Sequence, residues 1–321
     1  MLLKFFIKFL LVIVPTALAL GYVEYRLSVM NTHYFTKKIA FEKQLPNLEI
    51  LSVGSSNAYF GINPEYFSYP GYNFAFNAQS MYYDEALVMK YVDKMPKLKI
   101  VILPAIYYTM GTELDKTSEV WRTDFYQHYF HIPRESQANQ IKNLGWVLEP
   151  KYFSKISLYE KNVYGYYRRN FSDVIDYEPA LNGWYDSSDA PPANLEENNG
   201  LLGARAHNAT INTDIFDQNI MYWDRLIVQL KERHITPVLI QLPAHPSYYD
   251  NLDPTKFALL KQKLQKLADT YNLEYHDYTK DPRFSTDDYT VMVDHTNPRG
   301  AEKISRIINQ DIVVPLMKKF H

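Results

Sequence analysis

Short apolar runs recur along the chain, each closed by turn-forming residues, and longer amphipathic segments lie between them. Continuous apolar runs of this length are typical of strands that are buried on both faces, so they predict a parallel sheet. Alternation of strands with helices predicts a doubly wound α/β fold. The predicted strands cover 48–53, 72–76, 99–103, 237–242 and 273–278, and the predicted helices cover 83–94, 214–233, 255–271 and 298–320.

Residues 111–210 interrupt this alternation. They contain tyrosine pairs, scattered apolar patches and a stretch over 186–199 that is rich in Pro, Asn, Asp and Ser. We interpret 111–210 as an aromatic-rich insertion that caps the sheet, within a single domain over 48–320.

The amino terminus has the pattern of an export segment. Lys4 and Lys8 precede an uncharged run over 9–23, and an acidic residue follows it, which favours a cytoplasmic N-terminus and an exported remainder. The run is short for a bilayer, but counted from Leu2, with both lysines reaching the interface, it attains a spanning length. Ala17-Leu18-Ala19 also resembles a signal-peptide cleavage site. Residues 1–24 therefore predict a membrane anchor or a cleaved signal peptide, with 25–47 as a juxtamembrane connector and the rest on the periplasmic or extracellular face.

The composition removes several classes of function. The chain has 321 residues, with 34 basic and 36 acidic side chains, so a basic face for nucleic acid is not expected. Cysteine is absent, which excludes disulfides, thiolate metal sites and cysteine nucleophiles. No phosphate-binding, dinucleotide-binding or zinc-helix motif occurs, so no cofactor and no metal are predicted. The 28 tyrosines suit either sugar stacking or aromatic packing.

Candidate chemistry follows the first predicted strand and precedes the last predicted helix. Gly54-Ser55-Ser56 stands where the first strand turns into a helix, and Asp294-His295 stands in the loop before 298–320. In open α/β sheets, ligands bind at the carboxyl ends of the strands, where both segments are expected. Ser56 is the candidate nucleophile, and the His295 imidazole is the candidate base that accepts its proton.

The segments ILSVGSSNAYFGINPEYF and DHTNPRGAEKIS resemble the SGNH/GDSL hydrolase superfamily. They are most similar to its cell-envelope branch, which includes D-alanyl-transfer proteins of teichoic acid and acetyl-transfer proteins of alginate-type polysaccharides. The resemblance covers roughly 48–110 and 212–320. It implies a flavodoxin-like three-layer fold, with Ser56 as the nucleophile and His295 as the base.

Two features depart from the superfamily pattern. Its acid usually stands three residues before the histidine, where this chain has Met292. Asp294 is the candidate acid, although neighbouring side chains rarely meet in the required hydrogen bond, and Asp287 and Asp288 are alternatives. The usual glycine and asparagine donors of the oxyanion hole are also missing. The candidates for the oxyanion hole and the pocket are Asn57, Asn77 and His245, the last being either a pocket residue or a turn residue.

The sequence thus predicts an exported serine esterase or O-acyltransferase that acts on acyl groups of a cell-envelope polysaccharide. The alternative is a non-catalytic accessory protein of a polysaccharide export or modification complex. The expected partners are an envelope glycan or acylated sugar and a multi-span membrane acyltransferase.

Overall fold

The computed structural model describes residues 2–28, 32–138, 181–193 and 199–320. Within the predicted insertion, 139–180 and 194–198 therefore lie outside the described residues. The chain divides into two compact units, one formed by 1–36 with 121–178 and the other by 37–120 with 179–321. The boundaries of the predicted single domain and of its insertion stay predictions.

The second unit contains a sheet of five parallel strands in the order β2-β1-β3-β4-β5. All five predicted strands are present, and the predicted doubly wound α/β fold is confirmed. The order is that of flavodoxin-like sheets, in which the direction of winding reverses between β1 and β3. The strands are β1 Ile50–Ser52, β2 Gly71–Asn73, β3 Ile100–Pro104, β4 Thr236–Gln241 and β5 Tyr275–Asp277.

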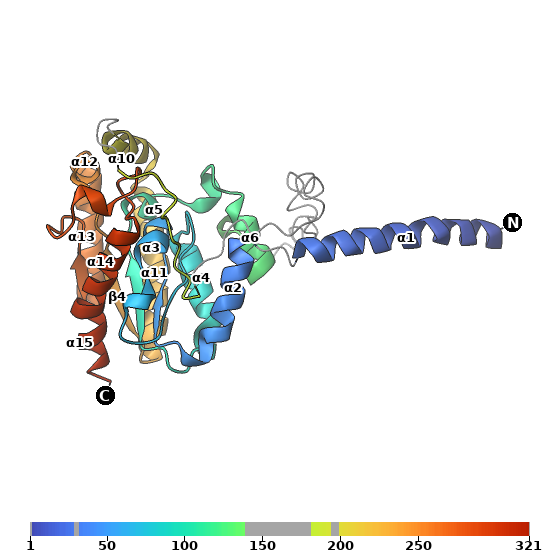
Figure 1. Ribbon diagram of the computed structural model, residues 1–321, viewed down its shortest axis with the longest axis horizontal. Helices are drawn as coiled ribbons and strands as arrows, with labels where there is room; N and C mark the ends of the chain where they lie inside the picture. Colours follow the sequence, from blue (N-terminus) through green and yellow to red (C-terminus); the bar gives the residue numbers. More distant parts are fainter. Residues whose placement is uncertain (1, 29–31, 139–180, 194–198, 321) are drawn as a thin grey trace. The chain divides into compact units, whose positions relative to one another are not determined.

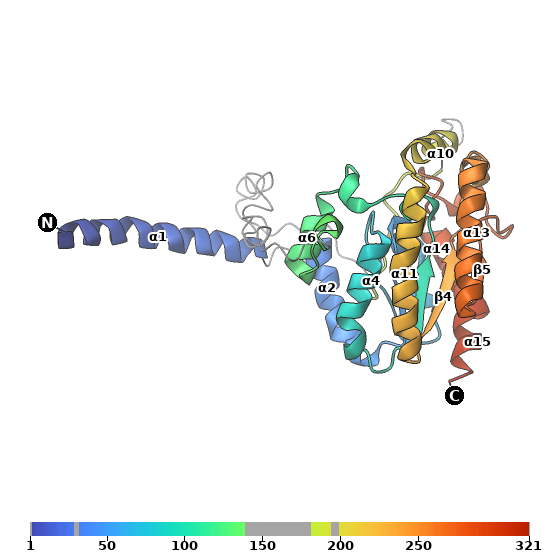
Figure 2. The same ribbon diagram turned by 180° about the vertical axis from the view of Figure 1, so that it is seen from behind.

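Helices cover both faces of this sheet (Figures 1 and 2). On one face α11 packs between α4 and α13, and on the other face α3 packs against α14. These helices are α3 Ser56–Gly61, α4 Met81–Tyr91, α11 Asp214–Glu232, α13 Pro254–Tyr271 and α14 Pro298–Ile308. The remaining helices of the described chain are α1 Leu2–Ser28, α2 His33–Gln44, α5 Tyr107–Met110, α6 Arg122–Phe130, α7 Glu135–Ala138, α10 Asn199–Thr210, α12 Pro246–Tyr249 and α15 Val314–Met317.

The predicted helix over 298–320 is present as far as Met317, but it is not a regular α-helix throughout. α14 ends at Ile308, a π-helical turn covers Asn309–Val313, and α15 follows. Pro315 is the physical reason, because it lacks an N–H and its ring would collide with the carbonyl of residue 311 in a regular α-helix. The wider π turn avoids that collision. The predicted connector over 25–47 likewise contains a helix, α2, that its pattern did not indicate.

Aromatic side chains account for much of the core of the second unit. Phe41 stacks on Phe74 with 3.9 Å between ring centroids, and Tyr91 meets both rings edge-on. Several of the largest buried side chains of this unit are aromatic: Tyr59, Tyr72, Tyr83, Tyr91 and Trp223. Part of the tyrosine content therefore serves packing.

The N-terminal helix α1 is apolar throughout most of its length. Residues Leu2–Arg26 are long and apolar enough to cross a membrane, with a mean hydropathy of 2.1, and none of this segment is buried. These properties fit a membrane anchor and a signal peptide equally.

Candidate active site

The Gly54 turn, formed by residues 53–55, connects β1 to α3. Gly54 has φ of +113°, a conformation that residues with a Cβ rarely adopt, and this lets the chain reverse direction directly after the strand. Ser55 is extended, and Ser56 is the first residue of α3. The Ser56 side chain therefore stands at the carboxyl edge of the sheet, beside the point where the winding reverses.

His295 meets Ser56 from the loop before α14. Its Nε2 lies 2.8 Å from the Ser56 hydroxyl oxygen, and its Nδ1 lies 2.7 Å from Oδ1 of Asp294. An ionised carboxylate accepts a hydrogen bond from Nδ1–H, and in this tautomer Nε2 is free to accept a hydrogen bond from the serine hydroxyl. The structure thus brings together Ser56, His295 and Asp294, three of the residues singled out by the sequence.

The environment keeps Asp294 ionised. Burial by itself raises the pKa of this carboxyl, but the charge and hydrogen bond of His295 outweigh it, so the pKa lies below its ordinary value. An ionised Asp294 can orient the imidazole and stabilise the imidazolium that forms when His295 takes a proton.

The geometry of Asp294 corrects the expectation that a neighbouring residue is poorly placed as the acid. Val293 has φ of +45°, and the Asp294 N–H donates to the carbonyl of Met292, which together make a γ-turn with a left-handed centre. Such a conformation is strained for a β-branched residue. The turn reverses the chain so that Asp294 folds back on the ring of His295, while the Met292 side chain is half-exposed. Backbone strain of this kind is concentrated at functional sites.

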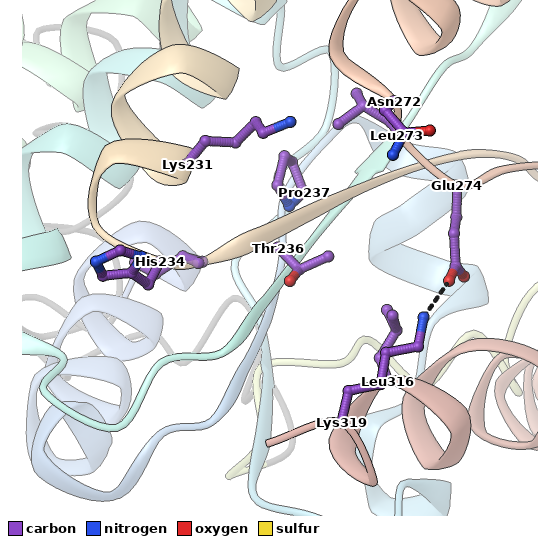
Figure 3. A pocket seen from close by; sticks show the side chains of 10 residues that line it. Lys231, His234, Thr236, Pro237, Asn272, Leu273, Glu274, Leu316 and Lys319 are labelled. Atoms are coloured by element: carbon purple, nitrogen blue, oxygen red, sulfur yellow. Dashed lines mark hydrogen bonds and ion pairs between the residues drawn. The ribbon is translucent and has the colours of Figure 1, made fainter.

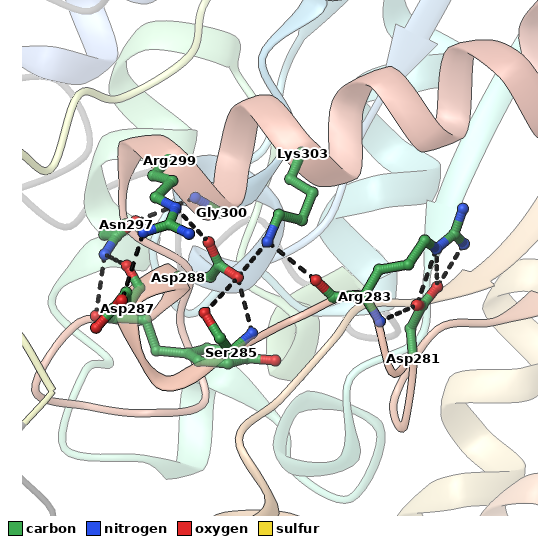
Figure 4. A network of polar contacts seen from close by, with 10 residues as sticks. Asp281, Arg283, Ser285, Asp287, Asp288, Asn297, Arg299, Gly300 and Lys303 are labelled. Carbon is green, nitrogen blue, oxygen red and sulfur yellow. Dashed lines mark hydrogen bonds and ion pairs between the residues drawn. The ribbon is translucent and has the colours of Figure 1, made fainter.

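Asp287 and Asp288, the alternative acids, have other partners. Figure 4 shows Asp288 facing Lys303 and Arg299 of α14, and its Oδ2 also accepts the Ser285 N–H at 2.8 Å. Asp287 is exposed and lies near the Arg299 guanidinium. The buried Asp288 therefore braces the loop that carries His295, whereas Asp287 makes only a surface ion pair, and neither residue contacts the imidazole.

The oxyanion and pocket candidates have different outcomes. The Asn57 amide donates to the backbone carbonyl of Asp294 at 2.6 Å, so it ties α3 to the histidine loop. Asn77 follows β2, and its Oδ1 is buried without a partner among the described residues. No contact between Asn77 and Ser56 is seen, and its role in an oxyanion hole stays a prediction. His245 uses both ring nitrogens structurally, Nδ1 with Ser247 and Nε2 with Thr286, at 2.9 and 3.0 Å.

Two further side chains near the site, those of His207 and Asp84, were not predicted from the sequence. His207 of α10 bonds the Tyr248 hydroxyl through Nδ1 at 2.7 Å. Burial lowers the pKa of His207, and the charges of Asp294 and His295 act on it in opposite directions. Asp84 of α4 accepts a hydrogen bond from the Gly54 N–H at 3.0 Å. Nothing in the local pattern around 84 or 207 indicates either position, because only the fold brings them to the site.

A cavity of about 600 Å³ lies away from this site (Figure 3). It is lined by residues at the amino-terminal ends of β4 and β5, the opposite edge of the sheet from Ser56. Lys231 donates to the Tyr271 carbonyl, and Lys319 pairs with Glu274 at 3.3 Å, so both cations are already engaged. We do not assign this cavity to the site.

The fold and site together define an α/β protein in which a serine, a histidine and an aspartate are linked by hydrogen bonds at the carboxyl edge of a parallel sheet. No protein-family model and no curated protein matches the sequence. Among solved structures, the chain is similar to a GDSL-like lipase from Bacteroides thetaiotaomicron, with 11% identity, 88% of this chain and 100% of that chain covered, and a TM-score of 0.43. It is also similar to a protein from Bacteroides fragilis described as a proposed acylhydrolase, with 14% identity, 86% and 94% covered, and a TM-score of 0.40. The SGNH/GDSL superfamily and its cell-envelope branch therefore stay predictions from the sequence motifs.

Proposed function

We propose that this chain is a serine esterase or O-acyltransferase that acts on acyl groups of a cell-envelope polysaccharide, outside the cytoplasm. The observation that supports the chemistry is the unbroken chain of hydrogen bonds from Asp294 through His295 to Ser56. A hydroxyl, an imidazole and a carboxylate in this order make an activated serine nucleophile.

In the proposed reaction, Ser56 Oγ attacks the acyl carbonyl carbon while Nε2 of His295 takes the hydroxyl proton. The tetrahedral intermediate then loses the alcohol, which receives that proton from His295, and an acyl ester remains on Ser56. Water or a sugar hydroxyl next gives its proton to Nε2 and attacks the acyl carbonyl carbon. When the second tetrahedral intermediate collapses to the free acid or the new sugar ester, His295 returns this proton to Ser56 Oγ. Asp294 stays ionised and accepts the hydrogen bond from Nδ1–H throughout.

A sugar as the substrate is supported by aromatic rings beside His295. The Phe60 ring lies 5.4 Å from the imidazole, and Tyr185 meets Phe60 edge-on at 5.0 Å. Tyr185 belongs to the described part of the predicted insertion, and its N–H donates to the Tyr59 carbonyl at 3.1 Å. Aromatic rings combine an apolar face with a polar handle, which suits contact with a glycan.

A multi-span membrane acyltransferase is the proposed partner. An acyl group that is activated in the cytoplasm has to cross the membrane before a domain outside can transfer it. The apolar helix α1 supports a position at the membrane, where such a partner would be within reach.

Labelling with a fluorophosphonate probe tests the proposed nucleophile. We expect the folded wild-type protein to be labelled at Ser56, and the Ser56→Ala variant to remain unlabelled. Ser55→Ala is the matched control and should still be labelled, because the Ser55 hydroxyl is buried and lies 3.4 Å from the Asn57 amide oxygen. An unlabelled but folded wild-type protein would favour the non-catalytic accessory alternative.

Product analysis separates the two proposed activities. With an acetylated sugar as donor and an unacetylated oligosaccharide as acceptor, a transferase should yield the acetylated acceptor, whereas an esterase should yield acetate alone. Absence of both products in labelled protein would contradict the polysaccharide part of the proposal.

A further inference from the structure

Asp84 is a fully buried carboxylate in the first turn of α4. Its Oδ1 accepts the Gly54 N–H at 3.0 Å and the Gln79 side-chain amide at 2.6 Å, and its Oδ2 accepts the Trp223 indole N–H at 3.2 Å. All three donors are neutral, and within the described chain no cation pairs with Asp84. A buried carboxylate without a cation is costly to keep, so packing alone is a poor reason for its presence.

Two of the three hydrogen bonds lead to the turn that precedes Ser56 and to the loop that follows β2. Gly54 is held on both sides, since its N–H is bound to Asp84 and its carbonyl accepts the Phe76 N–H at 3.2 Å. Because Ser56 follows two residues later, the orientation of this peptide sets where the serine hydroxyl points. On the other side, the Gln79 bond fixes the loop that follows β2, in which Ala78 has φ of +56°.

We propose that Asp84 is a positioning residue that joins the Gly54 turn to the Gln79 loop and so holds Ser56 in the geometry that His295 requires. This inference rests on the proposed function for its consequence in catalysis. Asp84 does not touch the reacting atoms; it acts through Gly54 and Gln79. Trp223 completes the arrangement by fixing the second carboxylate oxygen from α11, so the carboxylate cannot rotate away from the turn.

The experiment compares Asp84→Ala and Asp84→Asn with the wild type, using the full chain in detergent. The measurements are kcat and KM for p-nitrophenyl acetate, the rate of fluorophosphonate labelling at Ser56, and hydrogen exchange in residues 53–58. Tyr91→Phe is the matched control, because it lies on the same helix and loses one half-buried hydrogen bond to a carboxylate, the 2.8 Å bond to Glu42, away from the site.

We expect Asp84→Ala to lower kcat and the labelling rate by about 100-fold with little change in KM, since a small displacement of a reacting group costs that much. Exchange in 53–58 should become faster. Asp84→Asn keeps one acceptor oxygen and loses charge-assisted bonds, so we expect a loss of about 5- to 10-fold. Tyr91→Phe should leave all three measurements unchanged.

The proposal is overturned if folded Asp84→Ala keeps kcat and labelling near wild-type values, or if Tyr91→Phe loses as much. If Asp84→Ala does not fold, Asp84→Asn decides, and wild-type labelling in that variant overturns the proposal. If the wild type neither labels nor hydrolyses esters, the proposed function fails. Hydrogen exchange then judges Asp84 separately, and unchanged exchange in 53–58 contradicts the positioning role.

Discussion

At the scale of single residues, the proposed active site consists of a serine, an imidazole and a carboxylate, which we expect to act as one unit. We expect Ser56→Ala and His295→Ala each to remove nearly all ester hydrolysis, and the double variant to lose little more, because neither group works without the other. Steady-state hydrolysis of p-nitrophenyl acetate measures this. If the fold-losses of the two single variants multiply in the double variant, Ser56 and His295 do not act together.

Asp294→Asn tests the acid itself. The amide preserves size but cannot hold the Nδ1 proton, so the imidazole adopts the wrong tautomer and kcat should fall by about 10⁴-fold. Asp287→Asn is the control and should be near wild type, because Asp287 lies on the exposed side of the loop. A small effect of Asp294→Asn would leave a serine–histidine pair that works without this acid.

Asp84 also makes stability depend on pH. Burial, opposed by the bonds from Gln79, Trp223 and Gly54, raises the pKa of Asp84 to about 7 from an ordinary 3.8. The folded protein therefore binds this proton more tightly than the unfolded chain, and stability is lost as the pH rises from about 4 to about 7. Asp84→Asn removes this loss, which is at most about 4 kcal/mol.

We therefore expect Asp84→Asn to raise the free energy of unfolding at pH 8 and to change it little at pH 4.5, as measured by denaturant titration. The exposed Asp93→Asn is the control and should show no such difference between the two pH values. A variant that is destabilised equally at both pH values would contradict the raised pKa. A more stable but slower enzyme is the pattern expected when a costly buried group serves activity.

At the scale of elements, the loop that carries His295 is held against α14. Asn297 caps the helix by accepting the Gly300 N–H at 3.0 Å, and Asp288 binds Lys303 and Arg299 from the same helix (Figure 4). Gly300 permits this close approach, because a Cβ there would lie 2.1 Å from the Asp288 carbonyl oxygen. The close contact between the Asp288 backbone and the first turn of α14 therefore fixes the loop that carries His295.

Gly300→Ala should push α14 and the loop apart. We expect a destabilisation of about 1–3 kcal/mol and a fall in esterase activity, because the clash is with backbone that cannot move aside. Gly203→Ala on α10 is the matched control, since its Cβ would meet only the Tyr248 ring at 3.8 Å. Thermal unfolding and kcat measure the two effects, and an active, stable Gly300→Ala protein would contradict this account of the loop.

At the scale of the whole chain, the apolar helix α1 precedes the unit that carries the site. If α1 is an anchor, protein expressed from Met1 should stay in the membrane fraction through a high-salt wash, because about 20 apolar residues in lipid are not released by ionic strength. Fractionation followed by N-terminal sequencing measures this. A mature chain beginning at Leu20 would show a cleaved signal peptide instead.

Periodicity and turn residues in the sequence were enough to predict the sheet and most of its helices. Apolar runs that end in turn residues are local features, and burial on both faces leaves little choice of structure for them. The predicted helices over 255–271 and 298–320 begin within one residue of α13 and α14, because the caps that start them, Asp253 and Asn297, are residues close in the chain. Pro315 shows the limit of such patterns, because the hydrophobic positions around it do not indicate the π-helical turn that precedes it.

The sequence also predicted that Ser56 and His295 lie at the carboxyl edge of the sheet, because each of them follows a predicted strand in the chain and the strands are parallel. Which acid meets His295 was decided only in three dimensions, by the left-handed backbone at Val293 that turns Asp294 back on the ring. The contacts of Asp84 could likewise be recognised only from the tertiary structure. Two of its three donors, at positions 54 and 223, are 30 and 139 residues away in the chain, and hydrogen bonds over such separations leave no periodic signal in the sequence.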